Sequence, residues 1–412
     1  MRILHVNKFL YRRGGAEGYL FDVAERQRAA GHEVACFGMA HEENLPMPFE
    51  RHFPARVDFE PPPPGIGGKA RAVGRMLWSR SAAEGIDAVI AEFRPDVAHL
   101  HNIYHQLSPS ILRPLAARRV PVVMTLHDYK LACPTYRFLD HGEICEACLP
   151  HRFWEPLRRR CNAGSLGASA VSAVELSVHT AFGAYGHVGR FVCPSRFLLE
   201  KMRAGKVYPA RLRHLPNFVD VEGLAPKDAP GGGAVYAGRL SDEKGVDTLV
   251  EAVGADPALT LDVAGDGPAR AALERLAAER GAGDRIRFHG RLDPGALRSL
   301  LRASAVAVVP SRWYENMPLA VLEAFGAGLP VVATGLGGLP ELIEPGVDGA
   351  IVPPNDPTAL GAALQAIVRD PDRAFAMGRA ARAKAAREFA AGEHVARLGD
   401  IYAEAATFTG GR

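Results

Sequence analysis

Short apolar runs that lead through a turn into a helix recur along most of the chain, and this order constrains the fold more than any other feature. The first run, at 3–6, is followed by a glycine-containing turn at 11–15 and a helix from 16 to about 30. A second example joins the run at 305–309 to a helix that opens near Pro318. Strands that alternate with helices form parallel sheets with helices on both faces. The sequence therefore predicts an α/β protein with doubly wound sheets, whose ligands lie at the carboxyl ends of strands.

The length of the chain, 412 residues, predicts two domains, because a single hydrophobic core stops growing well below this size. A hydrophobic content of 48% and a charged content of 23% are those of an ordinary globular protein. A proline-interrupted connector at 213–220 and a proline- and glycine-rich stretch at 226–233 mark the boundary. We expect an N-terminal domain at 1–215, a C-terminal domain at 216–390 and a last helix at 391–412 that returns to the first domain.

Charge is distributed unevenly along the chain. Residues 1–215 hold 29 of the 49 Lys and Arg and 20 of the 46 Asp and Glu, a balance of +9, which leaves 20 against 26, or −6, for the remainder. A basic first half suits an anionic partner or a membrane surface. The segment 69–84 is basic and partly apolar, so we expect a helix that either packs on the sheet or lies on a membrane.

The N-terminal sequence MRILHVNKF is too short and too polar for a signal peptide, and no apolar run approaches the length of a membrane span. Six cysteines in a chain without a leader favour reduced thiols over a disulfide framework. We expect a cytoplasmic protein that does not bind nucleic acid, and contact with the inner face of the membrane stays open.

A polar loop between a predicted strand and helix gathers groups that suit a ligand. Glu315 lies directly before the helix, and Glu323 lies on it. The backbone N–H groups of Asn316, Met317 and Leu319 lie at the helix N-terminus, where they and the helix dipole favour an anion. Two carboxylates with amides between them suit a ligand that carries both hydroxyls and phosphates. An ordinary turn with two solvated glutamates is the alternative.

Cations flank two other predicted strand ends. Arg239 follows the strand AVYAG and Lys244 opens the next helix, so both can converge on a diphosphate. Arg291 comes directly after the run 286–290, which is the same kind of position. We therefore count Arg291 among the ligand-binding residues.

The first domain offers two candidate contacts at the ends of its predicted strands. Gly14 and Gly15 would let the backbone approach a phosphate or a sugar closely, although a plain tight turn also explains them. His127 follows the strand at 120–126 and, as a neutral hydrogen-bond donor, would reach a ligand hydroxyl. A histidine that is satisfied within the protein is the alternative.

Four cysteines cluster in a predicted insertion at 131–161. Cys145 and Cys148 form a C-x2-C pair, and Cys133 and Cys161 flank it at distances of 11 and 12 intervening residues. Four thiolates at this spacing can enclose a structural, tetrahedral Zn²⁺. Separate buried thiols and a redox or iron–sulfur role are the alternatives.

Five motifs in a fixed order resemble those of the family-4 retaining glycosyltransferases. They are GGAE at 14–17, TLHD at 125–128, LPNFVD at 215–220, GRLSDEKG at 238–245 and the Glu-x7-Glu pair at 315–323. The resemblance spans nearly the whole chain and implies the GT-B architecture, in which two Rossmann-like domains face a cleft. HDYKLACPTY, followed by the cysteine cluster, resembles a bacterial subgroup that builds surface polysaccharides.

In the second domain the resemblance implies contacts to a nucleoside-diphosphate sugar, the donor substrate. Arg239 and Lys244 match the pair that holds the donor diphosphate. Glu323 matches the carboxylate on the nucleotide ribose. Glu315, with the amides that follow it, matches the contact to the donor sugar. In the first domain, His127 matches a residue near the sugar on the opposite wall.

The implied activity is that of a retaining hexosyltransferase acting on a glycan, a lipid-linked or another hydroxyl acceptor, with Gly14 and Gly15 in a loop that closes over the donor phosphates. Two fixed cations would stabilise the charge that grows on the departing diphosphate. No Asp-x-Asp is placed as a bridge between a metal and the diphosphate, so we expect no cofactor in catalysis.

A sugar-nucleotide-binding protein of this fold without transferase activity is the alternative. An epimerase would need a further acid–base pair, and the presence of Lys244 and Glu315 disfavours a non-catalytic assembly subunit.

Overall fold

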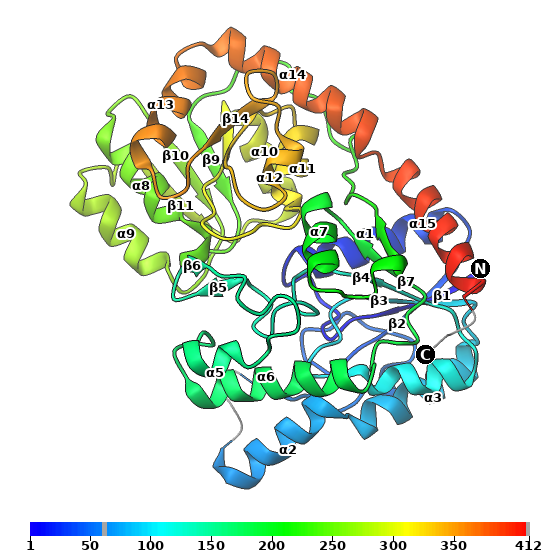
Figure 1. Ribbon diagram of the computed structural model, residues 1–412. Helices are drawn as coiled ribbons and strands as arrows, with labels where there is room; N and C mark the ends of the chain where they lie inside the picture. The colour runs from blue at the N-terminus through cyan, green and yellow to red at the C-terminus, as the bar shows by residue number, and fades with distance from the viewer. Residues whose placement is uncertain (60–63, 409–412) are drawn as a thin grey trace. The chain divides into compact units, whose positions relative to one another are not determined.

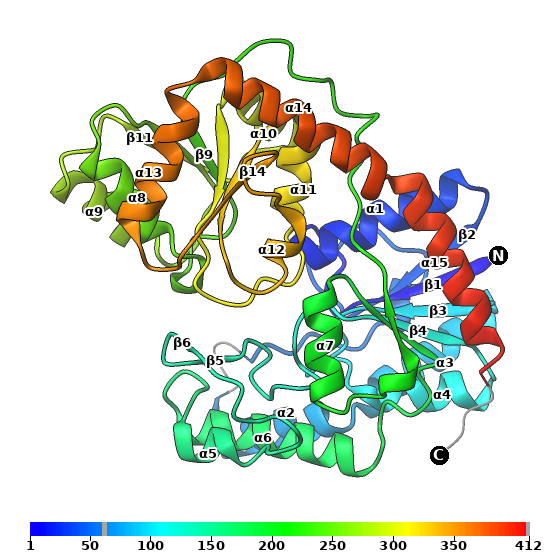
Figure 2. The same cartoon turned by 45° about the horizontal axis from the view of Figure 1, so that its top comes forward.

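Two six-stranded parallel sheets, each with helices on both faces, form two units of the protein, as the sequence predicts (Figure 1 and Figure 2). The computed structural model describes residues 1–59 and 64–408. The first unit comprises residues 1–141, 145–215 and those from 394 onward. The second unit comprises residues 142–144 and 216–393.

The strands of the first sheet follow the order β2-β1-β3-β4-β7-β8. Because β1 has β2 on one side and β3 on the other, the strand order reverses at β1, and a doubly wound sheet offers its ligand crevice at the carboxyl ends of the strands beside such a point. The bounds are β1 (Arg2–Val6), β2 (Glu33–Phe37), β3 (Val97–Leu100), β4 (Val122–Thr125), β7 (Arg190–Cys193) and β8 (Leu212–His214).

Helices α1 and α15 lie on one face of the first sheet, and α3 and α4 lie on the other (Figure 2). The C-terminal helix is fixed there by Tyr402, which bonds to Gln27 of α1 and His99 of β3. The helix bounds in this unit are α1 (Gly15–Ala29), α2 (Gly65–Leu77), α3 (Arg80–Phe93), α4 (Leu112–Ala117), α5 (Glu155–Arg159), α6 (Leu166–Ala181), α7 (Arg196–Ala204) and α15 (Ala391–Ala406), with 3-10 turns at Glu50–His52, Pro109–Ile111 and Pro209–Arg211. The insertion contains the short strands β5 (Leu139–Asp140) and β6 (Glu143–Ile144).

The single helix predicted over 69–84 is wrong, because the chain forms two helices there. Trp78 is extended, with φ −153° and ψ 102°, and ends α2. Ser79 then caps α3, since its side chain accepts from the N–H of Ala82. The backbone N–H of Ser79 is bound in turn by Ser108 Oγ at 2.9 Å. Within the described chain, no helix combines the length and apolar character needed to cross a membrane.

The second sheet has the order β11-β10-β9-β12-β13-β14, so its order reverses between β9 and β12. The strands are β9 (Ala234–Ala237), β10 (Leu261–Ala264), β11 (Ile286–Gly290), β12 (Val306–Val309), β13 (Val331–Thr334) and β14 (Gly349–Val352). The helices are α8 (Val246–Ala255), α9 (Arg270–Glu279), α10 (Pro294–Ala303), α11 (Leu319–Gly326), α12 (Leu339–Leu342), α13 (Pro357–Val368) and α14 (Pro371–Glu388), and Asp242–Lys244 forms a 3-10 turn.

Alternation along the strands builds a core on each face of this sheet. Val306 and Val308 belong to the cluster with α8, α9 and α13, whereas Ala307 and Val309 belong to the cluster with α10, α11, α12 and α14. Both faces are apolar because both are covered, as is usual in parallel sheets. The polar residues of interest therefore stand at the strand ends.

Candidate functional site

Glu315 and Lys244 meet beyond the carboxyl ends of β12 and β9, where the strand order of the second sheet reverses. Lys244 Nζ lies 2.7 Å from Oε1 of Glu315. The hydroxyl of Ser311 and the indole N–H of Trp313 donate to the same oxygen, at 2.6 and 2.9 Å. Glu315 is only 5% exposed. Lys244 and Glu315, which lie 71 positions apart in the sequence, thus form one buried polar cluster with Ser311 and Trp313.

Two glycines allow the loops of this cluster to approach one another. Gly245 has φ +66°, and a Cβ there would lie 2.1 Å from the carbonyl oxygen of Pro310. Gly337 has φ +65°, and a Cβ there would lie 2.2 Å from the carbonyl oxygen of Glu315. The next residue, Gly338, donates its N–H to that carbonyl at 2.7 Å. The glycine-rich turn at 335–338 therefore holds the backbone of Glu315 in place.

The charge on Glu315 is stabilised although the residue is buried. Burial alone would raise the pKa of its carboxyl, but the charge of Lys244 and hydrogen bonds from Lys244, Ser311 and Trp313 hold that pKa below its ordinary value. Lys244 Nζ also lies 5.0 Å from the centre of the Trp313 ring. The lysine ammonium is thus fixed by a carboxylate and an aromatic ring before any ligand binds.

The other predicted residues of the second unit occupy more open positions. Arg239 and Arg291 are exposed after β9 and β11, and neither has an ion-pair partner among the described residues. Glu323 is half-buried on α11, one turn after Leu319, the first residue of that helix. Pro318 is the N-cap of α11, with extended backbone, and the helix begins one residue later, near the predicted position.

Two predicted anion-binding amides differ in their surroundings. Asn316 is half-buried. Met317 is buried, and Asn217 holds it: the backbone N–H of Asn217 bonds to the Met317 sulfur at 3.1 Å, and its side-chain amide donates to the Met317 carbonyl at 3.0 Å. Met317 therefore fixes the start of α11, a structural role that the sequence pattern does not indicate.

In the first unit, the predicted glycines lie at the start of α1. Gly14 is the N-cap and Gly15 the first helical residue, and both are exposed. The first turn of α1 is tied to the end of β1, because the Asn7 amide donates to Glu17 at 3.2 Å. Asn7 Oδ1 also accepts from the N–H of Asn102, after β3, at 3.0 Å. The loops after β1 and β3 are thus joined beside the exposed glycines.

His127 lies after β4, as predicted, and its ring bonds to a second histidine. His127 Nε2 lies 3.0 Å from Nδ1 of His101, which is fully buried. Burial lowers the pKa of His127 to about 3, so its ring is neutral. His101 was not among the predicted site residues. The signal was available, since His99 and His101 are two residues apart and so lie on one face of a strand.

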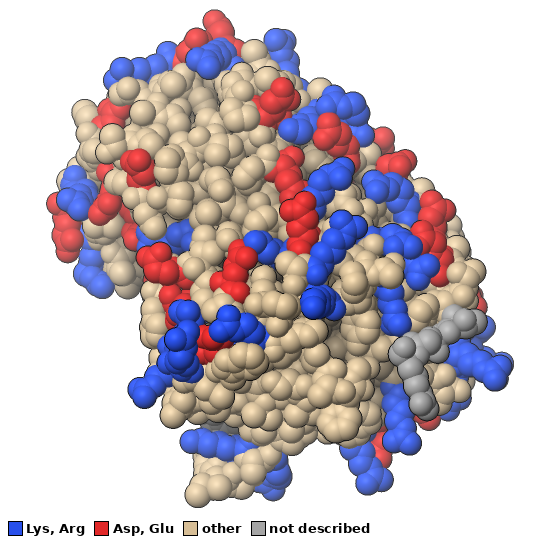
Figure 3. Space-filling view, viewed as in Figure 1, with Lys and Arg blue, Asp and Glu red and all other residues tan. Residues whose placement is uncertain are grey.

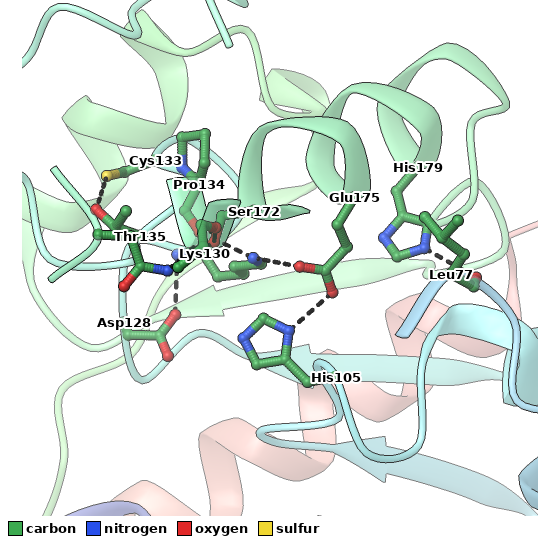
Figure 4. A network of polar contacts seen from close by, with 12 residues as sticks. Leu77, His105, Asp128, Lys130, Cys133, Pro134, Thr135, Ser172, Glu175 and His179 are labelled. Atoms are coloured by element: carbon green, nitrogen blue, oxygen red, sulfur yellow. Dashed lines mark hydrogen bonds and ion pairs between the residues drawn. The ribbon is translucent and has the colours of Figure 1, made fainter. Parts of the chain in front are cut away.

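The residues after His127 belong to a buried charge network (Figure 4). Lys130 Nζ lies 2.7 Å from Oε2 of Glu175 on α6, and both side chains are 2% exposed. Lys130 also donates to the carbonyl of Pro134 at 2.9 Å, and His105 Nδ1 lies 3.0 Å from Oε1 of Glu175. Although burial opposes it, His105 and Lys130 lower the pKa of Glu175. This pair joins the segment that enters the insertion to the helix that follows it.

The four cysteines of the insertion are free thiols, and two of them, Cys148 and Cys161, have a raised pKa. Cys133 and Cys148 are buried, and Cys145 and Cys161 are half-buried. Burial and the neighbouring Cys133, Asp140 and Cys145 raise the pKa of Cys161 to about 11. Among the described residues, however, no three of these sulfurs lie within 4.8 Å of one another, whereas ring nitrogens of His5, His99 and His101 do. A metal would have to draw the thiols together.

Two family models cover most of the chain. Residues 13–222 match the model described as Glycosyltransferase Family 4, and residues 230–384 match the one described as Glycosyl transferases group 1. A D-inositol 3-phosphate glycosyltransferase of Salinispora tropica is 37% identical over 95% of this chain and 81% of its own length. An alpha-D-kanosaminyltransferase of Streptomyces kanamyceticus is 32% identical, but the match covers 41% of this chain and 45% of that protein. Several such relatives are matched over less than half of their length.

Solved structures share the fold over nearly the whole chain. Sucrose-phosphate synthase from Thermosynechococcus elongatus superposes with a TM-score of 0.71, at 21% identity over 98% of both chains. HepE from Anabaena, in complex with UDP-glucose, gives a TM-score of 0.67 at 19% identity, over 98% of this chain and 99% of that one. At these identities the likeness shows the architecture of two Rossmann-like units.

Proposed function

This chain belongs to glycosyltransferase family 4, and we propose that it moves a hexosyl group from a nucleoside-diphosphate sugar to a hydroxyl of a glycan or lipid-linked acceptor. The observation that carries this proposal is the ammonium of Lys244, held by Glu315 at the point where the second sheet reverses its order. Arg239 stands exposed in the same strand-to-helix loop. UDP-glucose is bound in the related HepE structure, so uridine nucleotides are the first donors to test.

In the proposed mechanism the second unit binds the donor. Lys244 and Arg239 hold the diphosphate and stabilise the negative charge that develops as the glycosidic bond breaks. Glu315 keeps Lys244 in position, and the backbone N–H groups after it bind sugar hydroxyls. Glu323 accepts hydrogen bonds from the ribose. Arg291, exposed after β11, adds a further cation for the nucleotide.

The first unit contributes the histidine near the sugar and the loop over the phosphates. His127 contacts a hydroxyl of the donor sugar, and the exposed backbone of Gly14 and Gly15 closes over the diphosphate. We propose transfer with retention of configuration, in which the departing phosphate guides the acceptor to the same face of the sugar. No metal cofactor takes part in this mechanism. The acceptor class we favour is a growing surface polysaccharide.

A donor panel tests the proposal. Purified protein is heated with UDP-, GDP- and ADP-sugars, because a ligand that binds the native state raises the unfolding midpoint. The stabilising donor is then incubated with hydroxyl acceptors, and NMR of the product gives its anomeric configuration. We expect one nucleotide to stabilise the protein and an α-linked donor to give an α-linked product. A β-linked product would overturn retention. Stabilisation without any transfer or hydrolysis would favour the non-catalytic alternative.

We also propose that a face of the first unit contacts anionic membranes. Helices α2 and α5 both pack against α6, and Lys and Arg side chains gather over α5 and α2 on the face shown in Figure 3. The same two helices carry exposed large apolar side chains, since Ile66 of α2 is 90% exposed and Trp154, the N-cap of α5, is 58% exposed. Trp154 and Leu157 line an apolar groove with Val174 of α6. Basic residues around exposed apolar groups suit the interface of an anionic bilayer.

Vesicle sedimentation tests this second part separately. We expect the protein to sediment with vesicles that contain phosphatidylglycerol and to stay in solution with pure phosphatidylcholine. Ile66→Ser with Trp154→Ser should weaken sedimentation, whereas Val347→Ser, an exposed apolar residue of the second unit, should not. Equal sedimentation of both variants, or none with anionic vesicles, would remove the membrane from the proposal and leave transfer untouched.

A further inference from the structure

A row of buried histidines crosses one face of the first sheet. His5 on β1 is the register partner of His99 on β3, and His101 lies two residues further along. All three are fully buried. Their face of the sheet is covered by α1 and α15, which supply Gln27 and Tyr402. So many polar rings in a core need a complete set of hydrogen-bond partners.

The rings form a continuous chain of hydrogen bonds that ends at His127. Gln27 Oε1 lies 2.7 Å from His5 Nε2, and His5 Nδ1 lies 3.0 Å from His101 Nε2. His101 Nδ1 lies 3.0 Å from His127 Nε2. His127 itself is half-buried, so its ring joins the buried chain to the surface.

Burial makes each of these rings neutral, so each has a single N–H to donate. It lowers the pKa of His5 to about 4 and that of His127 to about 3, and it places the pKa of His101 well below the ordinary value. An amide oxygen only accepts, so His5 must donate from Nε2 to Gln27. His5 Nδ1 then accepts from His101 Nε2–H, and His101 Nδ1 accepts from His127 Nε2–H. Every bond in the chain runs in one direction.

A second branch of hydrogen bonds is compatible with the recorded orientation of the Gln27 amide, in which Oε1 faces His5 and Nε2 faces Tyr402. Gln27 Nε2 donates to the Tyr402 hydroxyl at 2.9 Å, and Tyr402 donates to Nδ1 of His99 at 2.8 Å. His99 Nε2–H then donates to Thr125 Oγ1 at 2.7 Å. Each donor in this branch meets an acceptor. With the amide in this orientation, the direction of the chain to His127 is set.

We infer that His5, His101 and Gln27 are positioning residues that hold His127 in the tautomer protonated at Nε2, so that its Nδ1 accepts a hydrogen bond from a ligand hydroxyl. The assignment deepens the proposed function, on which the hydroxyl contact rests. It reverses the donor role that the sequence pattern suggests for His127. A substrate hydroxyl, which can donate, would meet a fixed acceptor at this point.

The same three buried rings could instead hold a metal ion, but the hydrogen bonds argue against it. Ring nitrogens of His5, His99 and His101 lie within 4.8 Å of one another. Both nitrogens of His99 are already bonded, to Tyr402 and Thr125, and a metal would break at least one of these contacts. The 3.0 Å between His5 and His101 is an ordinary hydrogen-bond length.

Nitrogen NMR of the full chain, labelled with ¹⁵N only at histidine, reads the tautomer directly, because protonated and bare ring nitrogens resonate far apart. His127→Gln identifies the signals of that ring. We expect a proton on Nε2 and a bare Nδ1. A proton on Nδ1 of His127, or a charged ring at neutral pH, would overturn the inference. So would one equivalent of metal in protein purified without chelator and lost in His5→Phe.

Variants that do not alter His127 separate positioning from simple stability. His101→Phe and Gln27→Leu should give a mixture of the two His127 tautomers and lower kcat/KM by about tenfold, the effect of one hydrogen bond. His179→Phe removes another buried histidine, bonded to the carbonyl of Leu77, and should leave the tautomer unchanged. An unchanged tautomer in Gln27→Leu and His101→Phe would refute the relay. Failure of the transfer assay alone would leave the NMR result intact and count against the proposed function instead.

Discussion

At the scale of single residues, Lys244 carries the largest predicted effect on turnover. Its ammonium is held 2.7 Å from Glu315 and would stabilise the leaving diphosphate. We expect Lys244→Ala to lower kcat by about 10²–10³, the effect of removing one preorganised charge-stabilising group. Lys384→Ala is a matched control, since Lys384 also pairs with a buried carboxylate, Asp348, in the same unit. Steady-state kinetics on both variants decide the matter, and a Lys244→Ala enzyme of wild-type turnover would contradict the assignment.

Glu315 predicts a pH dependence of stability. Its folded pKa lies below the ordinary value of 4.5, so its ionised form stabilises the fold fully above about pH 4.5, and this contribution is lost as the pH falls through the lower folded pKa. Glu315→Gln should therefore lower the free energy of unfolding by about 3 kcal/mol at pH 7 and by much less at pH 3. Urea unfolding at both pH values measures the difference. Glu344→Gln, at an exposed glutamate, serves as control. A cost for Glu315→Gln that does not change with pH would show that the charge is not what matters.

At the scale of elements, the turn before α12 holds the backbone of Glu315. Gly337→Ala adds a Cβ that would lie 2.2 Å from the carbonyl oxygen of Glu315, and alanine is strained at the φ of +65° found there. We therefore expect weaker donor binding and a loss of about 1–3 kcal/mol in the free energy of unfolding. Gly346→Ala has a similar strain, at φ +84°, but meets nothing within 4 Å. Calorimetric titration with the donor should show weaker binding by Gly337→Ala than by Gly346→Ala. Equal affinity in both variants would mean that backbone strain, rather than contact with Glu315, explains the loss.

How far the elements follow from sequence depends on the range of the forces that form them. Strand β12 and helix α11 follow from a local apolar run and a proline, and were predictable. The break between α2 and α3 was not, because it depends on Ser79 bonding to Ser108, which is distant in the sequence. The family resemblance implied that Lys244 and Glu315 serve one ligand, but neither it nor the spacing predicted the ion pair between them. The His5–His101–His127 chain needs the register of three strands, which no local pattern supplies.

At the scale of the whole molecule, the two units have separate cores, and the buried ion pair of Lys130 and Glu175 lies in the first unit. Lys130 and Glu175 join the entry of the cysteine insertion to α6. Lys130→Met leaves the Glu175 carboxylate without its lysine and should destabilise the first unit by about 3–5 kcal/mol. The melting of the second unit should change little, so scanning calorimetry should show one shifted transition. Lys130→Met with Glu175→Leu should recover much of the loss. A shift of both transitions would show that the units unfold together.

The folding of the cysteine insertion in the first unit would depend on a metal if its four thiols bind one. Cys133 lies just after Lys130, and Cys161 lies just before α6, so the buried pair brings the two outer cysteines into one region. Cys148 packs there with Phe153 and Leu176. Burial and the neighbouring thiols raise the pKa of Cys148 and that of Cys161, yet among the described residues no three of the four sulfurs are close enough for a closed site. Zn²⁺ would deprotonate the thiols and draw them together, and metal binding would then be part of folding.

We therefore expect about one equivalent of zinc in protein purified without chelator, and loss of that zinc in Cys148→Ser. The variant should become sensitive to proteolysis between 131 and 161 and should use acceptors poorly, while donor binding by the second unit persists. Cys193→Ser is the matched control, because Cys193 is a buried thiol on β7, outside the insertion. Elemental analysis and thiol titration measure the first outcome. Less than a tenth of an equivalent of zinc or iron, with all four thiols reacting freely, would identify them as ordinary cysteines and leave the Lys130–Glu175 pair to order the insertion.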